Sequence, residues 1–336
     1  MNNMAKPKVF VTREIPDKGL NLILERFDTK VWRKYTPPPK EVIIEEAKNV
    51  DALVTLLTDK IDKEVLDAAK KLKIIAQYAV GYDNIDIEEC TRRGIYVTNT
   101  PEVLTESTAD FTWALILAVA RRVVEADKFV RSGEWERSRT GWHPKMLLGT
   151  DVHGKTLGII GLGRIGTAVA RRAKGFNMKV IYYSRRRKEE LEKELGLKFV
   201  DFETLLKEAD FVSIHVPLTK ETFYLIGERE LKLMKNTAFL INTSRGKVVD
   251  EKALYKALKE KWIAGAALDV FEEEPTPTDN PLLKLENVVV APHIASASYE
   301  TRSKMAEMVA KNLIAFFEGK IPPNLVNTDV LNKSKS

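Results

Sequence analysis

Short apolar runs alternate along most of the chain with segments in which apolar residues recur at helical spacing. Such runs predict buried strands, and strands that alternate with helices are typical of parallel α/β sheets. The pattern therefore predicts an α/β fold of two Rossmann-like or flavodoxin-like domains, each with a doubly wound parallel sheet. The predicted strands are 8–12, 29–33, 52–55, 74–76 and 95–98, then 155–160, 179–183, 211–215, 237–241, 265–270 and 288–290.

The pattern changes between the two groups of strands. One long helix is predicted from Leu104 to Arg131, and its middle, 111–119, is apolar nearly all round, as in a buried helix. The next stretch, 133–151, has no periodicity and carries Trp135 and Trp142. Aromatic residues in such a stretch suit an arm that contacts a second subunit, a substrate wall or ordinary packing. The sequence leaves these three open.

The second group of strands begins with a glycine motif. The predicted strand 155–160 is followed by Gly161, Gly163 and Gly166, then by helix-forming residues and a strand at 179–183. This spacing allows a tight strand-to-helix turn, close approach of a pyrophosphate and close packing of helix on strand. The free N–H groups at the start of the helix would hold the phosphates. We predict a dinucleotide site formed by Gly161, Leu162, Gly163, Arg164, Ile165 and Gly166.

The end of the second strand indicates which dinucleotide binds. An Asp or Glu at this point accepts from the ribose 2′-hydroxyl of NAD, whereas Arg suits the 2′-phosphate of NADP. Here Ser184, Arg185 and Arg186 follow the strand, and the first carboxylate is Glu189. Because Arg can form two parallel charge-assisted hydrogen bonds with a phosphate, we predict a preference for NADP(H), with NAD(H) as the alternative.

The net charge of +6 would suit a nucleic-acid-binding protein, but its location does not. The segment 171–188 contains eight Lys and Arg residues and no acid, and subtracting these eight from +6 leaves −2 for the rest of the chain. The excess positive charge lies beside the predicted phosphate site. We therefore expect no nucleic-acid partner.

Length and composition limit the class of protein. At 336 residues the chain is long enough for two domains, and its single cysteine, Cys90, excludes a disulfide framework. We see no signal peptide, and the longest apolar run, 111–120, is too short to span a membrane. We expect a cytoplasmic protein with no membrane partner. The 30% of charged residues, with Lys and Glu mixed, favours a thermophilic source.

Three successive predicted strands are each followed by a chemically useful residue: Arg245, Glu274 and His293. The carboxyl ends of parallel strands meet at one edge of a sheet, where ligands bind in such folds. A histidine can exchange a proton with a substrate oxygen, a carboxylate can orient it, and Arg can clamp a substrate carboxylate. Beside a nicotinamide cofactor, this set predicts oxidoreduction of a small 2-oxo or 2-hydroxy acid. Four scattered histidines and one cysteine, without metal-ligand spacing, predict no metal site.

Four segments give the chain a resemblance to a known family. They are 161–166 (GLGRIG), 242–250 (NTSRGKVVD), 268–275 (LDVFEEEP) and 292–296 (PHIAS). Together they resemble the D-isomer-specific 2-hydroxyacid dehydrogenases, and the resemblance extends over nearly the whole chain. It implies a substrate domain of residues 1–100 and 293–336, a dinucleotide-binding Rossmann domain of residues 101–292, and an active site in the cleft between them.

The same resemblance assigns roles to individual residues. It implies that Arg245 binds substrate and that Glu274 pairs with His293, the acid/base. It implies a homodimer joined through the coenzyme domains, and backbone N–H groups at residues 79–81 that meet the substrate carboxylate. The other implied contacts are Ala79, Val80, Gly81, Leu53 and Trp142 with substrate, Trp142 coming from the neighbouring subunit, and Thr243, Ser244 and Asp269 with cofactor, Asp269 near the nicotinamide amide.

Within the family, the chain most resembles the glyoxylate and hydroxypyruvate reductases. We therefore predict an NADP(H)-preferring reductase of small 2-oxo acids that uses a histidine as acid/base. One alternative is another D-2-hydroxyacid dehydrogenase, of the phosphoglycerate or lactate type. An alternative of another class is a dinucleotide-sensing, corepressor-like binding protein, against which the retained Arg245, Glu274 and His293 argue. Formate dehydrogenases carry Gln where Glu274 stands.

Overall fold

The computed structural model describes residues 5–333, and the chain divides into two compact units. The first unit comprises Met1–Leu104 and Ala297–Ser336, and the second comprises Thr105–Ser296. Residues 293–296, which the resemblance places in the substrate domain, thus belong to the second unit. Within the described residues, no helix is both long and apolar enough to cross a membrane.

The first unit has a five-stranded sheet in which all neighbouring strands are parallel. Its strand order is β2-β1-β3-β4-β5, so the chain starts beside the middle and extends to both edges. The strands are β1 (Lys8–Val11), β2 (Asp28–Val31), β3 (Ala52–Thr55), β4 (Ile74–Gln77) and β5 (Tyr96–Thr98); the helices are α1 (Asp17–Arg26), α2 (Lys40–Ala47), α3 (Lys63–Ala68), α4 (Ile87–Arg92), α13 (Tyr299–Phe317) and α14 (Val330–Lys333).

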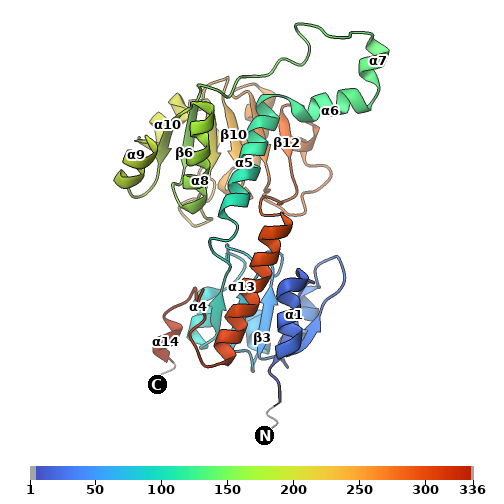
Figure 1. The fold of residues 1–336 in the computed structure, drawn as a ribbon, viewed down its shortest axis with the longest axis vertical. Coiled ribbons are helices and arrows are strands. Elements are labelled where there is room, and N and C mark those ends of the chain that lie inside the picture. Colours follow the sequence, from blue (N-terminus) through green and yellow to red (C-terminus); the bar gives the residue numbers. More distant parts are fainter. Residues whose placement is uncertain (1–4, 334–336) are drawn as a thin grey trace. The chain divides into compact units, whose positions relative to one another are not determined.

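Helices cover both faces of this sheet. On one face Phe10, Leu53 and Ile75 pack in a core with residues of α2, α3 and α4. The other face is covered by α1 and α13, which lie side by side although they are far apart in sequence (Figure 1). A Cβ added at Gly19 of α1 would lie 2.1 Å from the backbone of Ala306 in α13. Only glycine allows these helices to approach so closely.

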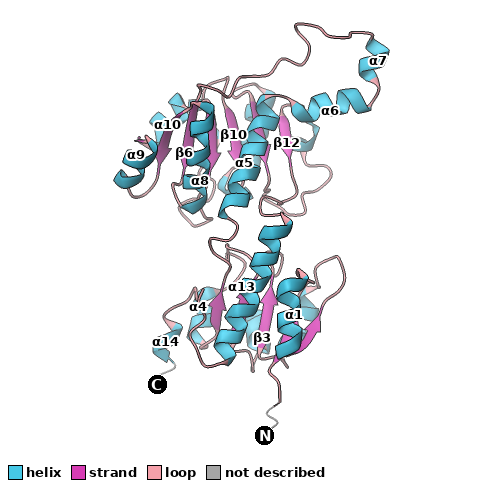
Figure 2. Cartoon of the chain, viewed as in Figure 1, coloured by secondary structure: helices cyan, strands magenta, loops and turns pink. Residues whose placement is uncertain are grey.

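The second unit has a seven-stranded, all-parallel sheet in the order β12-β11-β10-β9-β6-β7-β8 (Figure 2). The strand order reverses between β6 and β9, which makes this the switch point at which doubly wound sheets bind nucleotides. The strands are β6 (Thr156–Ile160), β7 (Lys179–Tyr183), β8 (Lys198–Phe199), β9 (Phe211–Ile214), β10 (Phe239–Asn242), β11 (Gly265–Leu268) and β12 (Val288–Val290).

Two layers of helices bury the faces of this sheet. One apolar core includes residues of α5 and α8 with Leu157 and Phe211, and the other includes residues of α10, α11 and α12 with Val212 and Leu240. The helices of the unit are α5 (Thr105–Ala120), α6 (Val123–Arg131), α7 (Glu134–Ser138), α8 (Arg164–Ala173), α9 (Glu189–Leu195), α10 (Phe202–Glu208), α11 (Glu228–Leu233) and α12 (Glu251–Lys259). The alternation of strands and helices predicted from the sequence is confirmed.

The predicted single helix from Leu104 to Arg131 is two helices. It breaks because Arg122 adopts a left-handed conformation with φ of 54°. The returning chain closes the end of α5: Thr150 N–H donates to the Ala120 carbonyl at 2.8 Å, and a Cβ at Gly149 would lie 2.4 Å from that oxygen. A contact with a segment thirty residues further on therefore ends the helix, and α6 and α7 extend from the body of this unit (Figure 1).

Candidate active site

Three loops of the second unit carry the predicted chemical residues. Arg245 follows β10, Glu274 follows β11 and His293 follows β12, and these three strands are parallel neighbours in the sheet. Their carboxyl ends therefore lie at the same edge. The positive charge of Arg245 is close enough to contribute to lowering the pKa of Glu274.

Glu274 and His293 form a hydrogen-bonded pair. Glu274 Oε2 lies 2.7 Å from His293 Nδ1, and Glu274 Oε1 accepts from the Phe271 N–H at 3.0 Å. Burial by itself would raise the pKa of Glu274, but the bond and charge of His293, the Phe271 N–H and Arg245 together lower it. An ionised carboxylate can only accept, so Nδ1 of His293 carries a proton and Nε2 is the nitrogen that can exchange one.

Asp269 holds the loop that carries His293. Its carboxylate accepts from the N–H groups of Ile294 at 2.8 Å and Ala295 at 2.9 Å, and its carbonyl accepts from His293 N–H at 2.8 Å. The side chain of Asp269 is fully buried, and burial raises its pKa although both backbone bonds act to lower it. His293 has a φ of 57°, in the left-handed region that residues other than Gly seldom adopt. The three bonds hold this strained turn. A contact between Asp269 and a nicotinamide stays a prediction.

The loop of Arg245 is held from within. The side chain of Asn242 accepts from Ser244 N–H at 3.0 Å and donates to the Arg245 carbonyl at 2.9 Å. A Cβ at Gly246 would lie 1.9 Å from the backbone of Phe271, so the loop after β10 reaches the loop after β11 only because residue 246 is glycine. This close approach places the Arg245 loop against the segment that leads to Glu274.

The glycine motif forms the turn from β6 into α8. Gly161 has a φ of 96°, and a Cβ there would lie 2.6 Å from the His215 carbonyl oxygen. A Cβ at Gly166 would lie 2.2 Å from the Gly161 carbonyl oxygen, whereas one at Gly163 would meet no atom within 4 Å. Two glycines are thus required by packing, and the third leaves open backbone at the start of α8, where no side chain caps the helix. That arrangement suits a bound phosphate.

Half of the basic cluster of residues 171–188 is neutralised in the fold. Arg171, Arg172, Lys179 and Arg187 each form a salt bridge with an acid, and that of Arg187 is with Glu192 at 2.8 Å. Arg185 and Arg186, at the end of β7, form no salt bridge with any residue in 5–333. Desolvation lowers the pKa of His215, at the end of β9, to about 3, and its Nε2 lies 2.8 Å from Ser213 Oγ. His215 therefore adds no positive charge near the glycine turn at neutral pH.

In the first unit, residues 79–81 form a loop after β4. Its carbonyl groups accept hydrogen bonds, whereas its N–H groups donate none within the described chain. The carbonyl of Ala79 accepts from Thr100 N–H at 2.8 Å, that of Val80 from the Asn99 side chain at 2.8 Å, and that of Gly81 from the Gln77 side chain at 3.2 Å. Within the described chain, none of the N–H groups of residues 79–81 has an acceptor. Adjacent free N–H groups are suited to bind an anion.

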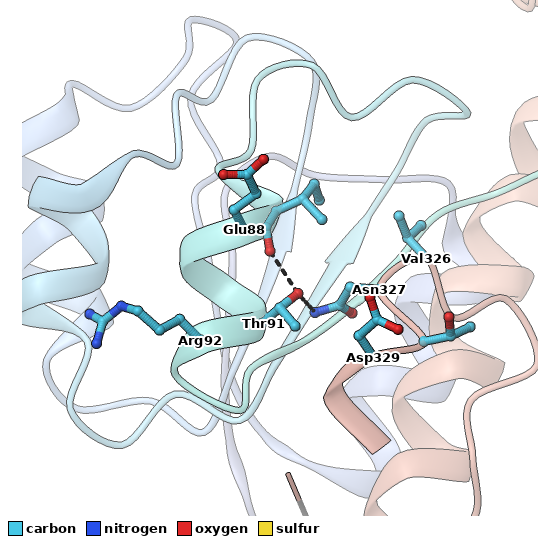
Figure 3. Close-up of a pocket in the computed structure, with 8 residues that line it drawn as sticks. Glu88, Thr91, Arg92, Val326, Asn327 and Asp329 are labelled. Carbon is cyan, nitrogen blue, oxygen red and sulfur yellow. Dashed lines mark hydrogen bonds between the residues drawn. The ribbon is translucent and has the colours of Figure 1, made fainter. Parts of the chain in front are cut away.

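A pocket of about 440 Å³ lies elsewhere in the first unit, between α4 and the segment 326–329 (Figure 3). Its polar groups bind one another: Asn327 Nδ2 donates to Thr91 Oγ1 at 2.9 Å, and Thr91 Oγ1 donates to the Ile87 carbonyl at 2.8 Å. Asn327 also accepts from Val97 N–H at 2.8 Å. These contacts join the C-terminal segment to the sheet, and none of the predicted site residues lines this pocket.

Comparison with known proteins identifies the family. The model for the D-isomer-specific 2-hydroxyacid dehydrogenase NAD-binding domain matches residues 113–295. The glyoxylate reductase of Korarchaeum cryptofilum is 68% identical over 326 residues, 97% of each chain, and that of Thermococcus litoralis is 67% identical over 329 residues, 98% of this chain and 99% of the relative.

The chain is a D-isomer-specific 2-hydroxyacid dehydrogenase. Solved structures agree with this membership. A protein of Thermus thermophilus superposes with a TM-score of 0.89 at 48% identity, with 95% of this chain and 99% of that chain covered. An NADPH-dependent glyoxylate/hydroxypyruvate reductase of Sinorhizobium meliloti, in complex with NADP and malonate, gives a TM-score of 0.86 at 34% identity, with 97% and 98% covered. The second unit is thus the part that binds a nicotinamide dinucleotide.

One of the predicted substrate contacts of this dehydrogenase lies in an unexpected place. Leu53 is fully buried in the middle of β3, so its side chain belongs to the core and has no surface for a ligand. Leu56, just after the same strand, is partly exposed. Trp142 is 83% exposed on the extension beyond α7.

A contact with α5 fixes the side chain of Thr243. Thr243 was expected to contact the cofactor, but its hydroxyl lies 3.0 Å from that of Thr112 in α5, which fixes it. Sequence reasoning did not single out Gln77 or Asn99, because a lone polar residue at a strand end has many ordinary roles. Asn242 stands in the family motif 242–250, but the motif gave it no role of its own. The bonds of all three amides to backbone carbonyl groups became visible only in the folded chain.

The lowered pKa of Glu274 predicts a pH-dependent contribution to stability. Its folded pKa lies below its ordinary value of 4.5, so the contribution is present above about pH 4.5 and is lost as the pH falls through the folded pKa. We expect the free energy of unfolding to be higher for the wild type than for Glu274→Gln at about pH 7, with a difference that shrinks towards about pH 3. Urea unfolding at several pH values measures this difference. Glu273→Gln, at an exposed neighbouring position, is the control. Its free energy of unfolding should differ from that of the wild type by an amount that stays nearly constant with pH.

Proposed function

We propose that this dehydrogenase reduces glyoxylate to glycolate, and hydroxypyruvate to glycerate, with NADPH as the preferred cofactor. The observation that carries the proposal is the Glu274–His293 pair at 2.7 Å, with Arg245 on the neighbouring loop. The glyoxylate reductases to which the chain is 67–68% identical support the choice of substrate. A small 2-oxo acid needs a proton donor for its oxygen and a cation for its carboxylate, and this set supplies both.

When bound, the reduced nicotinamide supplies the hydride that goes to the carbonyl carbon of the substrate. Protonated His293 donates the proton from Nε2 to the carbonyl oxygen, so that the product is a 2-hydroxy acid. Glu274 accepts from Nδ1 and stabilises the imidazolium before the transfer. Asp269 keeps the backbone at His293 in its left-handed turn, which directs the ring.

We assign the substrate carboxylate to two kinds of donor. Arg245 binds it through paired N–H groups and polarises the adjacent carbonyl. The N–H groups of residues 79–81, which have no acceptor in residues 5–333, supply further hydrogen bonds. Both kinds of contact select a 2-oxo acid over a carbonyl compound of the same size that has no carboxylate.

The NADPH preference rests on Ser184, Arg185 and Arg186. Arg187 is held by Glu192, whose pKa it lowers to about 2, so this Arg is committed to the fold. Arg185 and Arg186 have no salt bridge within the described residues, and Ser184 Oγ donates to the Arg186 carbonyl at 2.5 Å, which shapes the turn. Arg185 is near enough to Glu221 to help lower the pKa of that carboxyl, but a 2′-phosphate would give both guanidinium groups a directly bonded counter-charge.

We further propose that the enzyme is a homodimer joined through residues 123–151, the arm. No residue of α6 or α7 is buried, and Val123, Val130 and Trp142 are exposed by 52%, 53% and 83%. Apolar groups gathered on a projecting segment are typical of a subunit contact. In the dimer, Trp142 would close the substrate pocket of the partner.

Initial rates of glyoxylate reduction test the function directly. We expect turnover by the wild type, and a loss in kcat/KM of about 100-fold or more for Arg245→Ala, because the substrate carboxylate loses its charged partner. Arg245→Lys should retain only part of the wild-type kcat/KM, since Lys lacks the paired N–H donors of Arg. Lys247→Ala, which removes an exposed cation two residues away, serves as control. Full efficiency of Arg245→Ala would refute the assignment of this residue.

The cofactor preference is tested by removing the two Arg side chains that have no salt bridge. In the variant with Arg185→Ala and Arg186→Ala we expect the KM for NADPH to rise about tenfold or more, with little change for NADH, because only NADPH carries the 2′-phosphate. Arg187→Ala is the matched control, since that side chain already pairs with Glu192. An equal effect on both cofactors would contradict the phosphate assignment.

The arm is tested by sedimentation velocity. We expect a mass about twice that of one 38.1 kDa chain, and a shift towards the single chain for Val130→Asp, because a buried unpaired charge opposes association. Lys128→Ala, on the same helix, should leave the mass unchanged. A wild-type species of one chain at micromolar concentration would rule out the dimer.

A further inference from the structure

The proposed carboxylate site of the first unit depends on the orientation of three peptide groups. A trans peptide is planar, and its N–H points opposite to its C=O. Holding the Ala79, Val80 and Gly81 carbonyls therefore fixes the directions of the N–H groups of Val80, Gly81 and Tyr82. Two of these three carbonyls are held by side chains rather than by backbone: Val80 by Asn99 and Gly81 by Gln77.

We propose that Gln77 and Asn99 are positioning residues for substrate binding. Their side-chain amides hold the two peptide groups on either side of Gly81, so that the Gly81 N–H, which belongs to the proposed carboxylate site, stays directed at the substrate. This inference rests on the proposed function, because it takes the N–H groups of residues 79–81 to be the carboxylate site.

Gln77 is suited to this role because all its hydrogen-bonding atoms are engaged in a buried setting. Its side chain is fully buried, and Oε1 accepts from Thr55 Oγ1 at 2.6 Å. Nε2 donates to the Gly81 carbonyl at 3.2 Å and to Asn84 Oδ1 at 2.8 Å. An amide bound on both sides cannot rotate without leaving a buried polar group unpaired, which is unfavourable.

Asn84 extends the same hydrogen-bonded chain to the loop after β3. Its Nδ2 donates to the carbonyls of Leu56 at 3.0 Å and Asp59 at 2.6 Å. Asp59 is itself almost fully buried and accepts from Leu56 N–H at 2.7 Å. One chain of amides thus connects the loop of Leu56 with the peptide groups at Gly81, so that both loops keep one arrangement.

Gln77→Met tests the proposal, because Met keeps the length of the side chain and removes its hydrogen bonds. We expect the KM for glyoxylate to rise about tenfold and the KM for NADPH to stay within about twofold, since only the carboxylate contacts are misdirected. Asn327→Leu is the control: it removes a buried amide from the same unit, bound to Thr91 and Val97 and not to residues 79–81. An unchanged glyoxylate KM in Gln77→Met, or an equal rise in Asn327→Leu, would overturn the proposal.

Two further measurements keep the test decisive. If Gln77→Met does not fold, Asn99→Leu replaces it as the test, because it releases the Val80 carbonyl. We expect it to raise the KM for glyoxylate and to leave the KM for NADPH almost unchanged. If the wild type does not reduce glyoxylate, the proposed function fails, and crystal structures of the wild type and Gln77→Met then decide the positioning. Rotated peptide planes at residues 80–82 would support it, and identical planes would refute it.

Discussion

The sheet edge that carries Arg245, Glu274 and His293 depends on one buried carboxylate, that of Asp269. Asp269 accepts from two successive backbone N–H groups, of Ile294 and Ala295, and its own carbonyl accepts from His293. These bonds oppose relaxation of His293 from its left-handed φ of 57°. An ionised carboxylate is costly to bury, and the hydrogen bonds from Ile294 and Ala295 reduce that cost without cancelling it, since burial still raises the pKa of Asp269.

Close backbone approach is the second constraint, and glycine meets it. Gly161 and Gly166 bring the start of α8 onto β6, and Gly246 brings the Arg245 loop onto Phe271. In each case a Cβ would overlap backbone atoms rather than the flexible end of a side chain. These glycines therefore determine the geometry of both the proposed phosphate site and the proposed substrate site. Gly163 differs, because the space around it is open.

The two units use the same solution at the carboxyl ends of their strands. In the second unit the side chain of Asn242 holds the loop of Arg245, and in the first unit Gln77 and Asn99 hold the loop of residues 79–81. Side-chain amides can both donate and accept, so one residue can satisfy a carbonyl and anchor itself in the core. Backbone that has no place in a sheet ladder is thereby kept in one conformation and can act as a preorganised binding group.

The sequence by itself determined the fold class, the glycine turn and the residues that follow β10, β11 and β12. These signals are local: apolar periodicity, glycine spacing, and residue type at the end of a strand. Only the tertiary structure decided that the helix ends at Ala120, that Arg187 is paired while Arg185 is not, and that Leu53 belongs to the core. It alone revealed the bonds from Asp269 to Ile294 and from Asn99 to Val80. The physical reason is that most of these outcomes depend on a partner distant in sequence, brought near only when the sheets assemble. The pairing of Arg187 with Glu192, five residues further on, depends on how the turn into α9 folds.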